Sequence, residues 1–312
     1  MKRFLLLLCV LFSTHLSASD SFNRVYVFGD SLSDTGNIAS ILGPLPNPPF
    51  FNNRISNGEV SVEVFAEGIG LSADASLHLI GPAVGTNYAV AGARAGGPVA
   101  IDLPTQVNLF LANHAGVAPS DALYIVFIGG NDVRDARDSL DAVTAESIVD
   151  TAVTAEVAQV QTLIASGASN ILVMNVPDIG SIPESGLLAL LTGDNGIRER
   201  ATQLTKRYNK SLKRQLKVLR KATDTDIDVF NTFEEFADII EDAAENGFTN
   251  TSDACFSSVN LSFNVGCGFG ANFPQYIFFD EIHPTARVHA MIGQALLDEI
   301  NDEDDVEEKD AD

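Results

Sequence analysis

The chain of 312 residues contains no tryptophan, only three cysteines and five histidines, and 19 basic residues against 42 acidic ones. Its formal net charge of -23 leaves no extended basic face for contacts with phosphates, so nucleic acid is not an expected partner. The same charge opposes electrostatic binding to an anionic membrane. A high negative charge of this kind favours solubility.

Apolar runs of membrane-spanning length are also missing. The apolar run at 4–12 covers nine residues, whereas a spanning helix needs about 20, which disfavours a membrane anchor. Lys2 and Arg3 precede this run, and small residues follow it at 17–19. This layout is typical of a secretory signal peptide. We expect residues 1–19 to be cleaved, and the mature protein to be secreted or periplasmic without stable membrane insertion.

Removal of that segment leaves two cysteines, Cys255 and Cys267, in a region at 247–276 that is rich in glycine and asparagine. In an oxidising compartment an isolated pair favours a disulfide over two free thiols. A closed loop of this size stabilises a fold by about 3 kcal/mol on the chain-entropy model. Two cysteines without a matching cysteine or histidine pair make a poor zinc site, and we predict no metal.

The remaining chain alternates strand-like with helix-like runs, a pattern that favours a parallel sheet with crossover helices. Expected strands lie at 24–28, 86–90, 122–128, 170–175 and 226–230, and expected helices at 58–70, 104–115, 144–167, 196–221, 232–246 and 285–300. No linker or internal repeat divides the chain, so residues 20–301 are expected to form one domain. The acidic segment 302–312 is expected to be a disordered tail.

The first expected strand ends abruptly in the sequence VYVFGDSLSDTGN at 25–37. Gly29 breaks the apolar run, and Ser31 then follows at the carboxyl edge of the sheet, where open α/β sheets hold their ligands. Ser31 has two interpretations from this pattern alone. It is either the N-cap of the next helix or a nucleophile.

A serine nucleophile needs a base and donors for an oxyanion. His283 follows Asp280 by three residues, a spacing that lets the carboxylate orient the imidazole, although a structural histidine in a turn has the same pattern. Asn131 follows the most apolar expected strand, and Gly92 follows the run at 86–90. Both residues offer N–H donors, but glycine and asparagine are also ordinary turn residues.

Together these segments resemble the GDSL, or SGNH, family of serine esterases and lipases. Four blocks match in the family's order: GDSL at 29–32, the glycine at Gly92, GGND at 129–132 and DxxHP at 280–284. The segment NNRISNGEVSVE at 52–63 is similar to a further family segment. The resemblance extends from about residue 24 to about residue 300.

The resemblance implies a flavodoxin-like three-layer α/β/α sandwich with a central parallel sheet. It also implies that Ser31 is the nucleophile, His283 the general base and Asp280 the residue that orients it. Gly92, Asn131 and the Ser31 backbone N–H would form the oxyanion hole. The chain departs from the family at Phe279 and Ser61, where tryptophan is common, which bears on the packing of the cleft.

The implied activity is hydrolysis of carboxylic esters through an acyl-enzyme, without a cofactor, on a small-molecule or lipid ester. The Pro- and Phe-containing loop at 43–57 either lines the substrate cleft or packs down; its apolar part at 43–51 leans toward acyl chains. Alternatives are a lysophospholipase or glycerophospholipid acyltransferase, a carbohydrate acetylesterase, and a secreted binding protein that retains the fold without activity.

Overall fold

The computed structural model describes residues 22–139, 141–223 and 225–310. The expected signal peptide at 1–19 lies outside the described residues. Among these residues, no helix is both long enough and apolar enough to cross a membrane.

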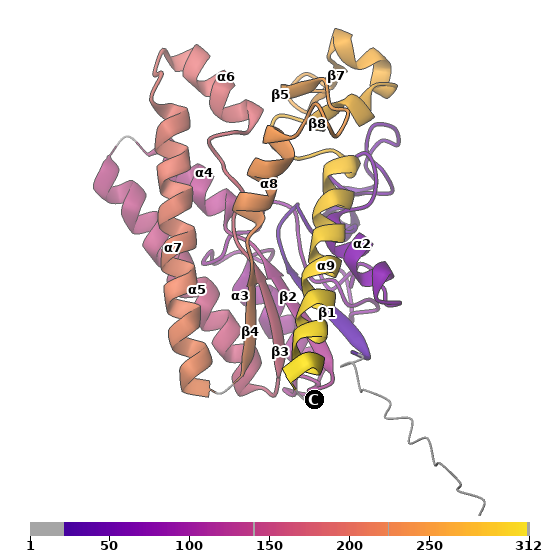
Figure 1. Ribbon diagram of the computed structural model, residues 1–312, viewed down its shortest axis with the longest axis vertical. Helices are drawn as coiled ribbons and strands as arrows, with labels where there is room; N and C mark the ends of the chain where they lie inside the picture. Colours follow the sequence, from indigo (N-terminus) through magenta and orange to yellow (C-terminus); the bar gives the residue numbers. More distant parts are fainter. Residues whose placement is uncertain (1–21, 140, 224, 311–312) are drawn as a thin grey trace, which may run out of the picture.

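A parallel sheet of four strands forms the centre of the molecule (Figure 1). Its strands lie side by side in chain order: β1 (Arg24–Gly29), β2 (Ala122–Phe127), β3 (Asn170–Met174) and β4 (Asp226–Phe230). Every residue of β2 is buried, as its apolar sequence predicted. Because the strands are parallel and in register, their carboxyl ends meet at one edge of the sheet.

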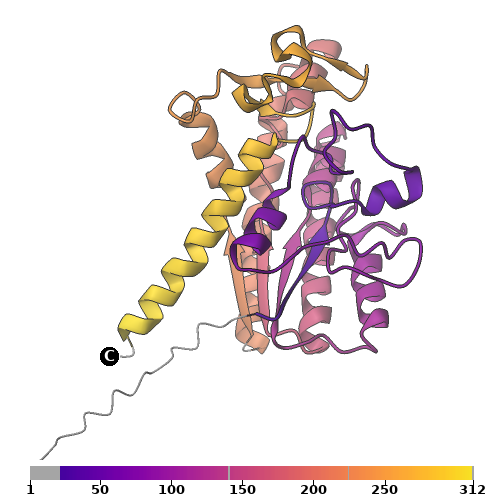
Figure 2. The ribbon, with the colours of Figure 1, turned by 90° about the vertical axis from the view of Figure 1, so that its right-hand side faces the viewer.

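Helices cover both faces of this sheet (Figure 2). One layer holds α3 (Leu103–Asn113), α5 (Ala142–Ala165) and α7 (Ile197–Thr223), with α5 in contact with both of the others. The opposite layer holds α2 (Ser61–Gly68), α8 (Thr232–Glu241) and α9 (Ala286–Asp310), with α9 in contact with α2 and α8. The predicted three-layer α/β/α architecture is confirmed.

The strand expected at 86–90 is not formed. The segment runs along the outer edge of β1, where Tyr88 N donates to Val27 O over 2.7 Å, but only Asn87 makes a β-bridge to that strand. The Asn87 side chain accepts from Ala89 N and donates to the Ser33 carbonyl. The segment keeps parallel backbone bonds to β1 from Val27 N to Thr86 O and from Val90 N to Gly29 O. Gly29 N donates instead to the Gln106 side chain over 2.9 Å, so the regular ladder is not completed.

Three helices were not expected: α1 (Asn37–Leu42), α4 (Gly130–Asp138) and α6 (Pro183–Thr192). Helix α9 also continues to Asp310, through most of the segment predicted as a disordered tail. The three glutamates and the one lysine of this segment have high helix propensity, whereas its aspartates do not. The disordered tail stays a prediction.

A small irregular unit, residues 250–279, lies at the carboxyl edge of the sheet; we call it the disulfide cap (Figure 1). It holds short strands β5 (Asn250–Ala254), β6 (Phe256–Ser257), β7 (Ser262–Phe263) and β8 (Tyr276–Phe278), and the 3-10 helices η1 (Val265–Gly270) and η2 (Phe273–Gln275). Cys255 and Cys267 form the predicted disulfide inside it.

A second apolar cluster, separate from the main core, joins this cap to the loop at 43–57. Phe50 of the loop packs edge-on against Phe256 and Phe279, with ring centroids 5.7 and 5.4 Å apart. Phe50 is buried, so this residue of the loop packs down rather than lining a cleft.

Candidate active site

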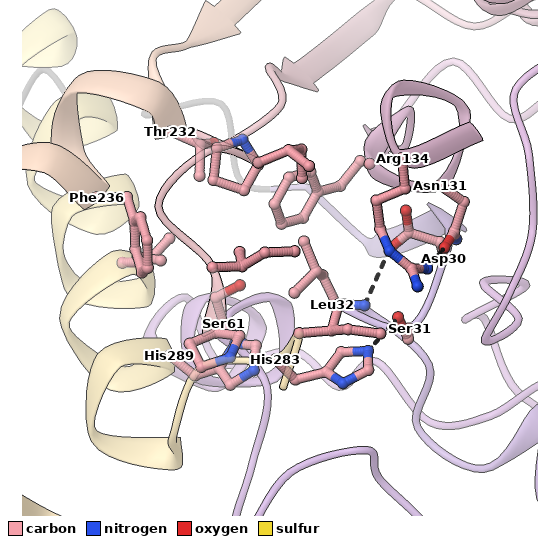
Figure 3. Close-up of a pocket in the computed structure, with 18 residues that line it drawn as sticks. Asp30, Ser31, Leu32, Ser61, Asn131, Arg134, Thr232, Phe236, His283 and His289 are labelled. Atoms are coloured by element: carbon pink, nitrogen blue, oxygen red, sulfur yellow. Dashed lines mark hydrogen bonds between the residues drawn. The ribbon is translucent and has the colours of Figure 1, made fainter. Parts of the chain in front are cut away.

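Ser31 and His283, which are far apart in the sequence, meet at the carboxyl edge of the sheet (Figure 3), and Asp280 lies beside His283. Ser31 follows β1, and Asp280 and His283 lie between β8 and α9. The Ser31 hydroxyl oxygen is 2.7 Å from His283 Nε2, and His283 Nδ1 is 2.8 and 3.0 Å from the two carboxylate oxygens of Asp280. All three residues are buried.

The carboxylate of Asp280 decides the tautomer of His283. An ionised carboxylate only accepts hydrogen bonds, so Nδ1 must carry the proton that it shares with Asp280. Nε2 is then unprotonated and accepts the hydrogen bond from the Ser31 hydroxyl. The arrangement can therefore take the proton from Ser31 as its oxygen attacks a carbonyl carbon.

Asp280 stays ionised although it is buried. Burial opposes its charge, but the charge of His283 and hydrogen bonds from His283 Nδ1 and from the backbone N–H groups of His283 and Ile282 outweigh that cost and lower the pKa of Asp280. The two backbone N–H groups lie 2.7 and 2.9 Å from Oδ1 of Asp280. The turn that positions His283 therefore also holds the Asp280 carboxylate in place.

The alternative interpretation of Ser31, as a helix N-cap, is wrong. Helix α1 begins at Asn37, six positions beyond Ser31, and Asp34 accepts from the N–H groups of Gly36, Asn37 and Ile38 at its start. The same carboxylate accepts from Ala91 N over 2.8 Å, which ties the segment before Gly92 to the turn after β1.

Two further donors predicted from the sequence lie on neighbouring segments. Gly92 has φ of 85°, a conformation that glycine adopts without strain. Asn131, in the first turn of α4, donates one amide hydrogen to Ala93 O over 2.9 Å. Its Nδ2 carries a second hydrogen that is available to a ligand.

Sequence reasoning missed Arg134. Its Nη1 donates to Asn131 Oδ1 over 3.0 Å, and this contact decides which end of the side-chain amide is the donor. A bidentate pair with Glu184 holds the guanidinium. The i,i+3 spacing of Asn131 and Arg134 on one helix is the only sequence signal for this contact.

Three buried carboxyl groups lie around this edge of the sheet. Burial raises the pKa of Asp30 to about 6, of Asp132 to about 7 and of Glu156 to about 8. Hydrogen bonds from Leu32 N to Asp30, from Ala95 N to Asp132 and from Tyr208 to Glu156 oppose these shifts.

An apolar cavity extends from Ser31 and His283 toward α8 and α9 (Figure 3). Its lining is largely aliphatic and aromatic and includes Leu32, Phe127, Pro177, Ile179, Ile182, Phe236, Ile282 and Ile292. Such a lining suits an apolar group better than a strongly polar one. Within the described residues, no group of three or more His, Cys, Asp or Glu side chains is arranged to hold a metal ion.

Three polar side chains, Ser61, Thr232 and His289, also line the cavity. Burial lowers the pKa of His289 to about 3, so the ring is neutral. His289 Nδ1 accepts from Ser61 N over 3.2 Å, which leaves the hydrogen on Nε2. Among the described atoms, this nitrogen and the hydroxyls of Ser61 and Thr232 lack a hydrogen-bond partner, so they can serve water or substrate.

The chain is similar to known esterases, lipases and acyltransferases. The family model described as GDSL-like Lipase/Acylhydrolase matches residues 25–296. A GDSL esterase/lipase of Arabidopsis thaliana is 25% identical, covering 87% of this chain and 86% of that protein. The phosphatidylcholine-sterol acyltransferase of Aeromonas hydrophila is also 25% identical, covering 94% and 96%. The crystal structure of Est24, a carbohydrate acetylesterase from Sinorhizobium meliloti, has a TM-score of 0.45 at 16% identity, covering 89% and 98%.

Proposed function

Because the chain belongs to the GDSL-like lipase/acylhydrolase family and is a carboxylic ester hydrolase, we propose that Ser31 is its nucleophile and that lipid acyl esters are its substrates. The assignment of Ser31 as the nucleophile rests on the short contacts that run from its hydroxyl through His283 to Asp280. The assignment of lipid acyl esters as substrates is supported by the apolar cavity beside the same hydroxyl.

The reaction begins when the Ser31 oxygen attacks the ester carbonyl carbon while His283 Nε2 removes the hydroxyl proton. The negative charge that develops on the carbonyl oxygen is stabilised by N–H groups of Gly92, Ser31 and Asn131. His283 then gives its proton to the departing alcohol, which leaves an acyl group on Ser31.

Deacylation repeats these steps with a water molecule as the nucleophile. His283 removes a proton from the water, the oxyanion forms again on the same donors, and Ser31 regains its proton as the carboxylic acid leaves. Asp280 stabilises the imidazolium in both halves of the reaction. No step needs a cofactor.

An acyl acceptor other than water is the second candidate. The similarity to a phosphatidylcholine-sterol acyltransferase over nearly the whole of both chains favours it. In that case an alcohol takes the place of water in deacylation, and the product is a new ester rather than a free acid.

A panel of esters tests the substrate class. We expect hydrolysis of long-chain acyl esters and lysophospholipids at a higher kcat/KM than that of acetylated sugars, because the cavity lining is apolar. A preference for acetylated sugars would overturn the lipid assignment. Release of labelled fatty acid with and without an added sterol or other alcohol separates hydrolysis from acyl transfer.

We also propose that the protein is exported with removal of residues 1–19. The charged start, the short apolar run and the small residues at 17–19 support this, as does a disulfide, which persists in oxidising compartments. Mass spectrometry of the protein recovered outside the cytoplasm tests the proposal, which requires a mature N-terminus close to residue 20.

A further inference from the structure

Two neighbouring elements above the carboxyl edge of the sheet expose apolar side chains to solvent. Helix α6 exposes Leu187, Leu190 and Leu191, whose i, i+3, i+4 spacing puts them on one face. The disulfide cap exposes Val259, Leu261, Val265 and Phe269. Helix α6 and the cap lie side by side at the same end of the molecule in both ribbon views (Figures 1 and 2), and α6 contacts β5. We call these seven residues the docking face.

These side chains project rather than pack. Val265 is 97% exposed and Phe269 89%, while Leu190 and Leu191 are 83% and 82% exposed. Exposure of single apolar side chains is ordinary, but seven on two adjoining elements form the kind of patch that marks an interaction site. One groove between the two elements is lined by four of them, Leu187, Leu190, Leu191 and Val259.

The seven side chains of the docking face stand on two segments without charged residues, although Arg198, Asp253 and Glu281 line the groove between these segments. Residues 254–279 of the cap contain no Asp, Glu, Lys or Arg, and neither do residues 185–193 of α6. The net charge of -23 repels an anionic surface. A lipid surface that binds the docking face must therefore have an apolar interior and neutral or zwitterionic headgroups.

The docking face is connected to the active site through Glu281, which lies next to Asp280. Glu281 Oε2 accepts from the Ser258 N–H of the cap over 3.0 Å, and its carbonyl accepts from Glu184 N of α6 over 2.8 Å. Ile182 lines the catalytic cavity, and the next residue, Pro183, lines the groove between α6 and the cap. A surface held by the docking face is thus next to the Ser31 cavity.

We propose that the docking face inserts into a neutral or zwitterionic lipid–water interface and holds the catalytic cavity against it. Projecting apolar tips on segments without charged residues bury their area in the interfacial layer of a lipid assembly, which needs no complementary pocket. A protein partner would need matching pockets and hydrogen bonds for these tips. The inference rests on the proposed function for its choice of lipid esters as substrates.

Flotation with vesicles tests docking separately from catalysis. The Ser31→Ala protein is mixed with phosphatidylcholine vesicles, which it cannot degrade under the proposed mechanism, and its bound fraction is measured. We expect it to float with these vesicles, and to float less with vesicles enriched in phosphatidylglycerol. Hydrolysis of a soluble short-chain ester by the unmodified protein reports on the proposed function in a separate measurement.

Two charge variants in the Ser31→Ala background identify the surface. Val265→Asp with Phe269→Asp in the cap, and Leu190→Asp with Leu191→Asp on α6, are each expected to lower the vesicle partition coefficient roughly tenfold or more. Aspartate suits position 269 because the residue there has φ of 56°, a conformation that aspartate tolerates. Because the two double variants lie on separate elements, one of them still tests the proposal if the other fails to fold.

The matched control is Val218→Asp, since Val218 is 66% exposed on α7, near the end that leads into β4 and away from the docking face. It should leave partitioning unchanged. Absence of flotation by the Ser31→Ala protein, tighter binding to anionic vesicles, or equal loss in the control would overturn the proposal. So would concentration-dependent self-association that the four aspartates abolish, because a second copy would then cover the face.

Discussion

The Ser31 hydroxyl oxygen lies 2.7 Å from His283 Nε2, although 252 positions separate the two residues in the chain. The contact forms because β1 ends at the same edge of the sheet where the segment between β8 and α9 turns back onto the molecule. This contact joins the N-terminal and C-terminal parts of the domain, which also meet where α2 packs against α9, and the proposed chemistry depends on it.

Replacing Ser31 with alanine should abolish ester hydrolysis while leaving the fold intact. We expect kcat to fall roughly 10⁴-fold or more, because no nucleophile remains. Labelling by a fluorophosphonate probe should disappear with it. Ser33→Ala is the matched control, since Ser33 is buried in the same segment and its hydroxyl has no hydrogen-bond partner among the described atoms. Normal activity of Ser31→Ala would refute the assignment.

Asn131→Asp removes both amide donors while keeping the size of the side chain. We expect kcat to fall by roughly 10²- to 10³-fold with a smaller change in KM, because the lost hydrogen bond forms mainly as charge develops on the oxygen. Steady-state kinetics on a soluble ester measures this. Asn113→Asp, at an exposed position on α3, serves as control. An unchanged kcat for Asn131→Asp would remove this residue from the oxyanion hole.

Asp280→Asn should lower kcat roughly 10⁴-fold, because an amide no longer selects the tautomer with the proton on Nδ1. The lowered pKa of Asp280 also makes it a source of stability. That contribution is present above its ordinary pKa of 3.8 and is lost as the pH falls through the lower pKa of the folded protein.

Chemical denaturation as a function of pH therefore compares the wild type with Asp280→Asn. We expect the difference in the free energy of unfolding to shrink in acid below about pH 4. A difference that stays constant down to strongly acidic pH would contradict the ionised state of the buried carboxylate.

Glu156 should make the protein less stable at alkaline pH. The unfolded chain ionises this group near its ordinary pKa of 4.5, whereas the folded protein holds its proton up to about pH 8, so stability falls as the pH rises between these values. Glu156→Gln keeps an oxygen that accepts from Tyr208. We expect it to raise the free energy of unfolding at pH 8 by a few kcal/mol, with a smaller effect near pH 5. The exposed control Glu67→Gln should change stability by less than about 0.5 kcal/mol.

Opening the disulfide should destabilise the cap. Cys255→Ser with Cys267→Ser, or treatment with a reductant, should lower the free energy of unfolding by about 3 kcal/mol, because the unfolded chain regains the freedom of the loop. Thermal unfolding with and without reductant measures the effect. The double variant must be insensitive to reductant, and a wild type that is equally insensitive would argue against the bond.

The sequence predicted the regular part of the fold well because burial on both faces leaves a strong local signal. The apolar runs that became β1, β2 and β3 were recognised, and so was β4, although Asp226 and Asp228 alternate with its apolar residues. The strand expected at 86–90 was wrong because Gly29 N of β1 donates to the Gln106 side chain of α3 instead of to this segment, a contact between residues 77 positions apart. Short helices such as α4 were missed because their polar sequences follow no apolar period.

The candidate site shows the same division. The order of four short blocks, and the family resemblance that it carries, singled out Ser31, Gly92, Asn131, Asp280 and His283 as candidates, whereas each block alone also fits a cap or a turn. Arg134 was missed because its contact with the Asn131 amide depends on side-chain directions, which spacing alone does not give.

What the sequence determined by itself is the set of reacting groups, the acidic charge and the apolar strands, because these follow from residue identity and local pattern. Only the tertiary structure decided that the Ser31 hydroxyl meets His283, that Phe50 is buried against the disulfide cap, and that the exposed leucines of α6 adjoin that cap. These are relations between segments far apart in the chain. They depend on how the layers pack against one sheet, and no local pattern specifies that packing.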